Sequence, residues 1–159
     1  MAAAKPQKTA KKMPAKKKAA PKRTAKTRKQ CIAVPGISEA LAKQKVPLSP
    51  AVKANGFVFV SGLPPVDPKT GRVVAGDIRR QTRLCMQNVK RTLAAAGSSL
   101  DRVCKVTIYC ANAAYYNTVN DEYRKFFPKD PPARTFVTVG SWPWEFDIEI
   151  ECTALCDPD

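Results

Sequence analysis

The sequence of 159 residues contains no histidine. Without histidine, neither a Ser-His-Asp triad nor a Cys-His pair can form, so two common nucleophilic mechanisms are excluded. The chain also lacks the GxxxxGK[ST] phosphate loop, the GxGxxG dinucleotide motif and the GxSxG nucleophile motif. Carboxylate, thiol, tyrosine and lysine side chains remain for acid–base chemistry, and arginine remains for anion recognition.

Long apolar runs are also missing, because no stretch approaches the ~20 residues that a membrane-spanning helix needs. A secretory signal is absent too, so we expect the six cysteines to be reduced and mostly buried rather than paired in disulfides. There is no CxxC motif, and Cys152 and Cys156 lie four residues apart in a strand-like segment. We therefore predict neither a metal site nor a cofactor.

Residues 1–30 contain no acidic residue, although they carry ten lysines and two arginines. The whole chain has a formal net charge of +15, yet residues 31–159 hold 16 basic and 13 acidic residues. The basic character therefore belongs to the first 30 residues, where any attraction to phosphate or anionic surfaces is assigned. This Lys/Ala/Pro-rich segment has almost nothing to bury, so we expect a disordered tail.

The rest of the chain has the length of one domain. Residues 31–47 carry few apolar positions, and the sequence leaves open whether they form a short helix at 38–45 or a linker along the domain. We place the folded domain at residues 48–157.

The most clearly predicted element is a helix that Asp77 caps and that Gly97 ends. Its apolar residues recur at steps of three, four and seven, which is typical of one buried helix face. The residues of this apolar helix stripe are Ile78, Cys85, Val89, Leu93 and Ala96.

Before this helix, residues 57–61 and 72–74 flank Asp-Pro and Thr-Gly turn signals and predict a β-hairpin.

Downstream, the alternation of Cys104, Val106, Ile108 and Cys110 with polar residues predicts a half-buried strand at 103–110. A second helix at about 113–127 and strands at 134–139 and 146–155 follow, and an additional strand near 50–53 is left open. The order β-β-α-β-α-β-β predicts an α+β fold, a two-layer sandwich in which a mixed sheet has two helices on one face.

Several segments resemble the RidA (YjgF) family in order and at consistent spacing across residues 49–155. They are FVFVSGLPPVDPKTG, NVKRTLAAAGSSLDRVCKVTIY, VNDEYRKFF, PPARTFV and IEIECTA. The resemblance implies a chorismate-mutase-like fold that assembles as a homotrimer, with sites between subunits. It also implies cofactor-independent hydrolysis of enamines and imines, here 2-imino acids, to 2-oxo acids and ammonia.

The same resemblance assigns roles to individual residues. Arg134 corresponds to the arginine that binds the substrate carboxylate, a task that suits a planar guanidinium. Glu149 corresponds to the glutamate that positions the attacking water, and these two residues are the expected catalytic pair. The expected substrate-binding residues are Arg134, Phe136, Gly62 and Asn120, and Ser61 belongs to the same turn as Gly62.

Three positions depart from the family pattern. Phe136 stands where the family often has cysteine, Ala51 where it often has tyrosine, and Leu63 where it often has glutamine. These departures bear on the shape of the pocket and the choice of substrate. The strand pattern alone favours other readings, in which Arg134 is only an interface ion-pair partner and Glu149 is one of three acids on a solvated strand face.

The basic tail neutralises phosphates without recognising sequence, which predicts salt-sensitive contacts with RNA, DNA or a ribonucleoprotein. A solubilising or mitochondrial-targeting role is the alternative. The competing function for the whole chain is therefore a non-catalytic trimer tethered through its tail. We expect an intracellular protein in the cytoplasm, with the nucleus and the mitochondrion as alternatives, and no membrane partner. The predicted nucleic-acid contacts are Lys11, Lys12, Lys16, Lys17, Lys18, Lys22 and Arg23.

Overall fold

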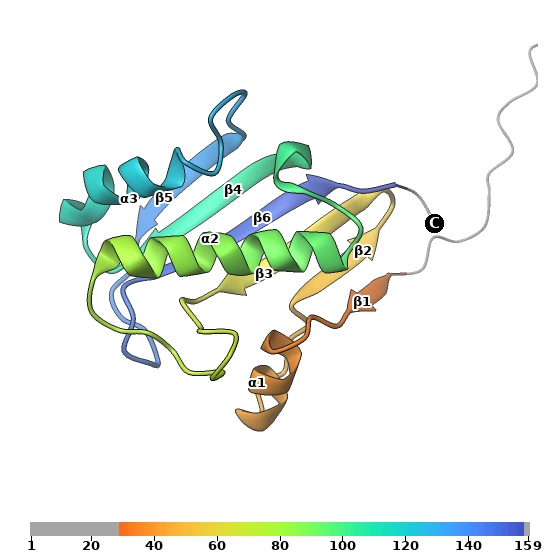
Figure 1. The fold of residues 1–159 in the computed structure, drawn as a ribbon, viewed down its shortest axis with the longest axis horizontal. Helices are drawn as coiled ribbons and strands as arrows, with labels where there is room; N and C mark the ends of the chain where they lie inside the picture. Colours follow the sequence, from red (N-terminus) through yellow and green to blue (C-terminus); the bar gives the residue numbers. More distant parts are fainter. Residues whose placement is uncertain (1–28, 158–159) are drawn as a thin grey trace, which may run out of the picture.

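A six-stranded mixed sheet forms the centre of the structure, a computed structural model that describes residues 29–157 (Figure 1). The strand order is β1-β2-β3-β6-β4-β5. Only the β4–β5 pair is parallel, and the other four pairs are antiparallel. The strands are β1 (Gln30–Ile32), β2 (Ala51–Ala54), β3 (Phe57–Leu63), β4 (Val103–Cys110), β5 (Ala133–Thr138) and β6 (Ile148–Leu155).

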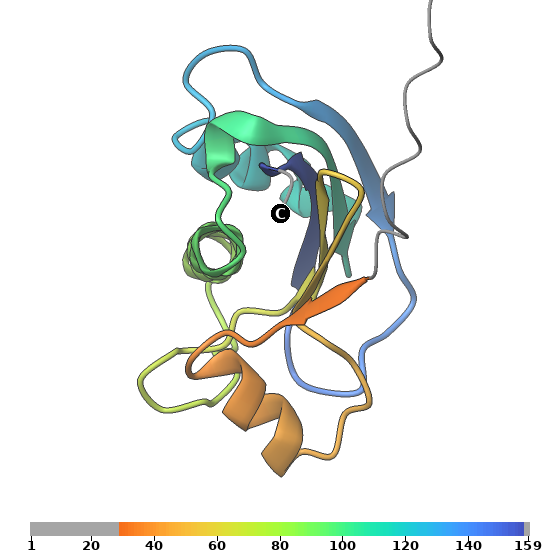
Figure 2. The ribbon, with the colours of Figure 1, turned by 90° about the vertical axis from the view of Figure 1, so that its right-hand side faces the viewer.

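Two helices, α2 (Ile78–Ala95) and α3 (Tyr116–Tyr123), cover the same face of this sheet (Figure 2). The short helix α1 (Ile37–Lys43) lies beside the end of the sheet near β1 and β3. Two 3-10 turns, η1 (Leu100–Arg102) and η2 (Ala113–Tyr115), precede β4 and α3. The α+β fold, the mixed sheet and the order of its core elements are confirmed, and β1 and α1 are additions before that core.

Helix α2 forms where the sequence predicted it. The Asp77 side chain accepts a hydrogen bond from the backbone N–H of Arg79 at 2.9 Å, which satisfies one free donor of the first turn. Gly97 follows the helix with a φ of 72°, a left-handed conformation that glycine adopts without steric cost. The apolar stripe of α2, from Ile78 to Leu93, is buried against the sheet.

The predicted hairpin between 57–61 and 72–74 is wrong. Strand β3 pairs with β2 on one side and β6 on the other, and residues 72–74 contribute only an isolated bridge from Val73 to Val66. The hairpin turn is Asn55-Gly56, whose φ angles of 52° and 78° fit the type I′ turn that matches the twist of paired strands. The strand left open near 50–53 is therefore β2.

Smaller differences concern the ends of elements. The helix predicted at 113–127 begins as a 3-10 turn and ends at Tyr123. Cys104 is exposed, because the ladder between β4 and β6 is irregular between Val103 and Lys105. Cys31 is the other exposed thiol, and the remaining four cysteines are buried and free.

Residues 31–47, left open as helix or linker, contain the end of β1 and all of α1. Ile32, Val34 and Ile37 of this segment are buried in the main hydrophobic core. No helix within residues 29–157 has the length and apolar character required to cross a membrane. The predicted tail contacts from Lys11 to Arg23 lie outside the described residues.

Candidate functional site

Arg134 lies on β5, one of the two edge strands, and faces the layer that contains α3. Its backbone pairs with Val106 of β4, which is buried beneath the helices. The guanidinium carbon lies 4.9 Å from the ring centre of Tyr123 and 5.9 Å from that of Tyr116. Within residues 29–157 it forms no ion pair with a carboxylate. Aromatic faces thus hold the cation in place while its planar donors are free for an anion.

Phe136 and Asn120 lie beside this arginine. Phe136 is two residues along the same strand face, and its ring packs edge-on against Tyr116 with 5.1 Å between centres. On α3, Tyr116, Asn120 and Tyr123 are spaced by four and three residues, which places them on one helix face. The structure therefore brings together three of the expected residues, Arg134, Phe136 and Asn120.

Two polar atoms of this α3 face are buried without a partner among the described residues. They are the Oδ1 atom of Asn120 and the hydroxyl of Tyr123. Burial raises the pKa of Tyr123 to about 12, although the positive charge of Arg134 opposes that change. A buried polar atom without a hydrogen bond is costly, so this face is suited to a ligand or neighbouring group that supplies one.

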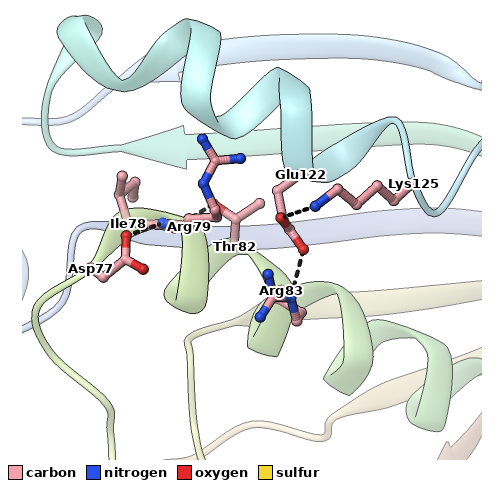
Figure 3. Close-up of polar contacts among 7 residues, drawn as sticks. All are labelled: Asp77, Ile78, Arg79, Thr82, Arg83, Glu122 and Lys125. Carbon is pink, nitrogen blue, oxygen red and sulfur yellow. Dashed lines mark hydrogen bonds and ion pairs between the residues drawn. The ribbon is translucent and has the colours of Figure 1, made fainter.

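Helix α3 is held against α2 by a buried carboxylate (Figure 3). Glu122 accepts hydrogen bonds from Arg83 Nε at 2.6 Å and from Lys125 Nζ at 2.7 Å, and its side chain is only 2% exposed. The hydrogen bond from Arg83, followed by that from Lys125, lowers the pKa of Glu122 despite burial. This contact fixes the helix from which Tyr116, Asn120 and Tyr123 extend.

Glu149 lies on β6 next to Ser61 and Gly62, which are part of strand β3 and not a turn, at the irregularity in its pairing with β6 between Val60 and Leu63. A Cβ atom at position 62 would lie 1.9 Å from Glu149 Oε1, so only glycine leaves room for the carboxylate. The Ser61 hydroxyl donates a hydrogen bond to the backbone carbonyl of Ser49 at 2.8 Å, which ties this part of β3 to the segment before β2. Burial, followed by the nearby charge of Glu151, raises the pKa of Glu149 above the ordinary glutamate value.

Glu149 and Arg134 do not meet within one chain. Glu149 pairs with Tyr109 of β4, whereas Arg134 pairs with Val106, three residues away on the same strand. Because side chains alternate along a strand, Val106 faces the helices and Tyr109 faces the opposite side of the sheet. The two expected catalytic side chains therefore extend from opposite faces of one sheet, and Gly62 accompanies Glu149.

Some contributors to the site were not identified from the sequence. Tyr116, which is 46% exposed and whose ring lies 5.9 Å from the Arg134 guanidinium carbon, was not among the expected site residues. The position of α1 beside Glu149, where Ala40 and Leu41 line the same cavity as the carboxylate, was also not predicted. Ala51, where the family often has tyrosine, is fully buried in β2 and leaves no ring at that position.

Comparison with known proteins finds one family model and many related chains. The model described as Endoribonuclease L-PSP matches residues 38–156. A RutC family protein of Pyrococcus horikoshii is 44% identical over 108 residues, which cover 68% of this chain and 86% of the relative. The chloroplastic Reactive Intermediate Deaminase A of Arabidopsis thaliana is 41% identical over 108 residues, covering 68% of this chain and 58% of the relative.

Solved structures show the same fold. Yeast Mmf1 is 33% identical with a TM-score of 0.72, covering 82% of this chain and all of that one. The YjgF gene product of E. coli is 35% identical with a TM-score of 0.66, and the match covers 69% of this chain and 88% of that one. E. coli TdcF, solved with bound serine, is 33% identical with a TM-score of 0.66, and the match covers 70% of this chain and 89% of that one.

Proposed function

Because the chain belongs to the RidA (YjgF) family, which is also described as endoribonuclease L-PSP, we propose that it hydrolyses 2-imino acids to 2-oxo acids and ammonia. One relative is named a reactive intermediate deaminase, and another was solved with bound serine, a molecule with an α-carboxylate. In this proposal Arg134 binds the substrate carboxylate, and Glu149 acts as the general base.

The reaction needs only water and these side chains. Glu149 accepts a proton from a water molecule while the water oxygen attacks C2 of the protonated imine. The resulting carbinolamine then receives that proton on nitrogen, and the C–N bond breaks as the C2 carbonyl forms. Glu149 accepts the proton that the C2 hydroxyl loses in this step and passes it to the departing ammonia, which leaves as ammonium. Arg134 holds the carboxylate throughout and keeps C2 within reach of the water.

The observation that carries the proposal is the placement of Arg134 and Glu149 on opposite faces of one sheet. Arg134 lies against aromatic rings and has no carboxylate partner within residues 29–157, and the Glu149 carboxylate lies in the space over Gly62. A site that uses both requires two copies of the chain, with Arg134 from one and Glu149 from the next. Phe136 and Asn120 would then line the arginine side, and Gly62 the glutamate side.

The sheet face without helices supplies a surface for that assembly, and we propose a homotrimer. Large apolar side chains are exposed on this face, at 38% for Phe57, 49% for Phe59, 39% for Val137 and 44% for Leu155. Phe57, Phe59 and Leu155 are neighbours on this face, and exposed apolar clusters of this kind are typical of subunit interfaces. In a closed ring of three, each neighbouring pair would form one site.

The experiment that tests this function is ammonia release from 2-iminopropanoate and 2-iminobutanoate generated by an amino-acid oxidase. The wild-type protein should accelerate hydrolysis beyond the spontaneous rate. Arg134→Ala should lose most of that acceleration through a higher KM. Equal rates with the wild type, with Arg134→Ala and without protein would contradict the proposal.

A second function rests on the uneven charge of the chain. All acidic residues lie after position 30, while 12 of the 28 basic residues lie before it. Such a tail suits binding to nucleic-acid phosphates that adds to imine hydrolysis or replaces it. Binding of a labelled single-stranded RNA at low salt, and its loss at high salt, tests this role.

A further inference from the structure

The outer side of helix α2 carries charge of one sign. Along its 18 residues the helix has five basic residues and no acidic residue. Arg80, Arg83, Lys90 and Arg91 are exposed, and their spacing places them within about 100° of the helix circumference, on one face. We call these four residues the basic ridge. Figure 2 shows α2 end-on, with the sheet on one side and no other described helix or strand over the opposite side.

The stability of α2 does not explain this arrangement. Arg79 and Arg80 lie in the first turn, where the positive end of the helix dipole disfavours cations. The last turn, where cations are favourable, has no basic residue. Arg83 also lies one turn from both Arg79 and Arg80, and like charges at this spacing repel. Positions that break a local stability rule are typical of functional sites, so the reason for these charges lies in a contact outside α2.

Contacts within the described part of the chain engage only one member of the ridge. Arg83 donates a hydrogen bond to Glu122 on α3. Arg80, Lys90 and Arg91 form no ion pair within residues 29–157. Their charges face solvent over a helix length of about 16 Å, as the rise per residue gives it. Such a surface attracts a polyanion and steers its approach.

Shape and chemistry favour an acidic polypeptide over a nucleic acid at this surface. The ridge is the convex side of one helix, and α2 contains no aromatic side chain on which a base could stack. Three of the four ridge residues are arginines, whose planar guanidinium groups form bidentate contacts with carboxylates. Glutamates three or four residues apart on a partner helix lie about 5–6 Å from each other, which matches the spacing of Arg80 and Arg83.

We propose that the basic ridge is a docking site for an acidic segment of another protein, one that presents carboxylates along one face of a helix. The exposed apolar residues Phe57 and Phe59 lie on the sheet face without helices, so assembly through that face leaves the ridge accessible. A ring of three subunits would present three ridges, and a partner with several acidic segments would gain affinity by binding them together. Docking does not depend on imine hydrolysis.

The test measures binding of a fluorescein-labelled peptide of glutamate and alanine, with glutamates at steps of three and four, to the full-length protein at low salt. Arg80→Glu combined with Lys90→Glu reverses two ridge charges and should weaken binding by about tenfold or more, because like charges across an interface are costly. Lys43→Glu combined with Lys69→Glu is the matched control. It makes the same change in net charge at exposed positions outside α2 and should weaken binding much less.

A second measurement separates docking from a structural role of the ridge. A glutamate in the first turn suits the helix dipole, so Arg80→Glu alone should raise the midpoint of urea unfolding while it weakens peptide binding. A lower midpoint would give Arg80 a structural role and overturn the proposal. Equal weakening in the two double variants would show that only overall charge matters, and absence of peptide binding by the wild type would also overturn it. Loss of single-stranded RNA binding in the ridge variant, with peptide binding unchanged, would assign the ridge to nucleic acid instead.

Discussion

Gly62 and Glu149 constrain each other, because the carboxylate lies where a side chain at position 62 would be. Gly62→Ala should therefore displace the Glu149 carboxylate and lower kcat for imine hydrolysis by about tenfold or more, since a small misplacement of a catalytic group can cost about 10²-fold. Gly140→Ala is the matched control, because a Cβ at Gly140 meets no atom within 4 Å. Steady-state kinetics that show equal kcat for both variants would refute the role of this contact.

Glu149 itself should set the turnover rate. Glu149→Gln keeps the size of the side chain but cannot accept the proton, so kcat should fall by about 10²–10⁴-fold while KM changes little. Arg134→Lys should show the reverse pattern, because lysine does not reproduce a bidentate contact with a carboxylate. Steady-state kinetics with one imine measure both. If Glu149→Gln mainly raised KM and Arg134→Lys mainly lowered kcat, the proposed roles of the two residues would be contradicted.

The pH dependence of kcat/KM follows from the raised pKa of Glu149. A general base must be deprotonated, so activity should fall as pH decreases through a pKa above the ordinary glutamate value. Burial is the larger cause and the charge of Glu151 is the smaller one. Glu151→Gln removes that charge and should move the acidic limb of the pH profile to lower pH. An unchanged or upward-shifted limb would contradict this account.

At the scale of elements, the buried Glu122 joins α2 to α3 (Figure 3). Glu122→Gln should lower the free energy of unfolding at pH 7 by about 1.5–3 kcal/mol, the usual contribution of hydrogen bonds to a charged group. Because folding lowers the pKa of Glu122, this stabilisation is present above the unfolded pKa and is lost as pH falls through the folded pKa. The difference between wild type and variant should therefore shrink below about pH 4.

Urea unfolding at pH 7 and in acid measures this difference. Asp121→Asn is the neighbouring control, since Asp121 is 53% exposed and lies 3.6 Å from Arg124. Exposed pairs of this kind contribute about 0–1 kcal/mol, so the control should be nearly as stable as the wild type. A stability difference for Glu122→Gln that persists unchanged in acid would show that the carboxylate charge is not the cause.

Elements with strong local signals could be predicted from the sequence, and those that depend on distant partners could not. Helix α2 has its own cap, apolar stripe and stop, so Asp77 and Gly97 mark its ends without tertiary information. Residues 72–74 have the composition of a strand, but β3 pairs instead with β6, which lies far away at the end of the sequence. The Asn55-Gly56 turn was the better hairpin signal.

For the candidate site too, local sequence motifs were informative, and features that depend on distant residues were not predicted. Motif matches located Arg134 and Glu149, but their separation on two sheet faces depends on the register across β4. The position of α1 beside Glu149 depends on contacts between residues far apart in the chain, which no local pattern reveals.

At the scale of the whole molecule, the basic segment before residue 29 and the part of the chain that the structure describes should act independently. Removing residues 1–28 leaves β1 and the core intact, so imine hydrolysis and assembly should persist. Salt-dependent RNA binding should disappear, because log affinity should fall with log salt by about 0.7 per phosphate neutralised on a single strand. Fluorescence anisotropy at several salt concentrations measures this slope. Tight, salt-dependent RNA binding by the shortened chain would place the nucleic-acid site within residues 29–159.

The central claim is that each active site takes Arg134 from one subunit and Glu149 from the next. Mixing Arg134→Ala and Glu149→Gln chains by co-refolding tests it directly, because some interfaces then combine the intact Glu149 of one variant with the intact Arg134 of the other. Random mixing in a closed ring should restore about one quarter of wild-type imine hydrolysis, while each variant alone stays nearly inactive. Mixed trimers that are no more active than either parent, beside an active wild type, would contradict the shared site.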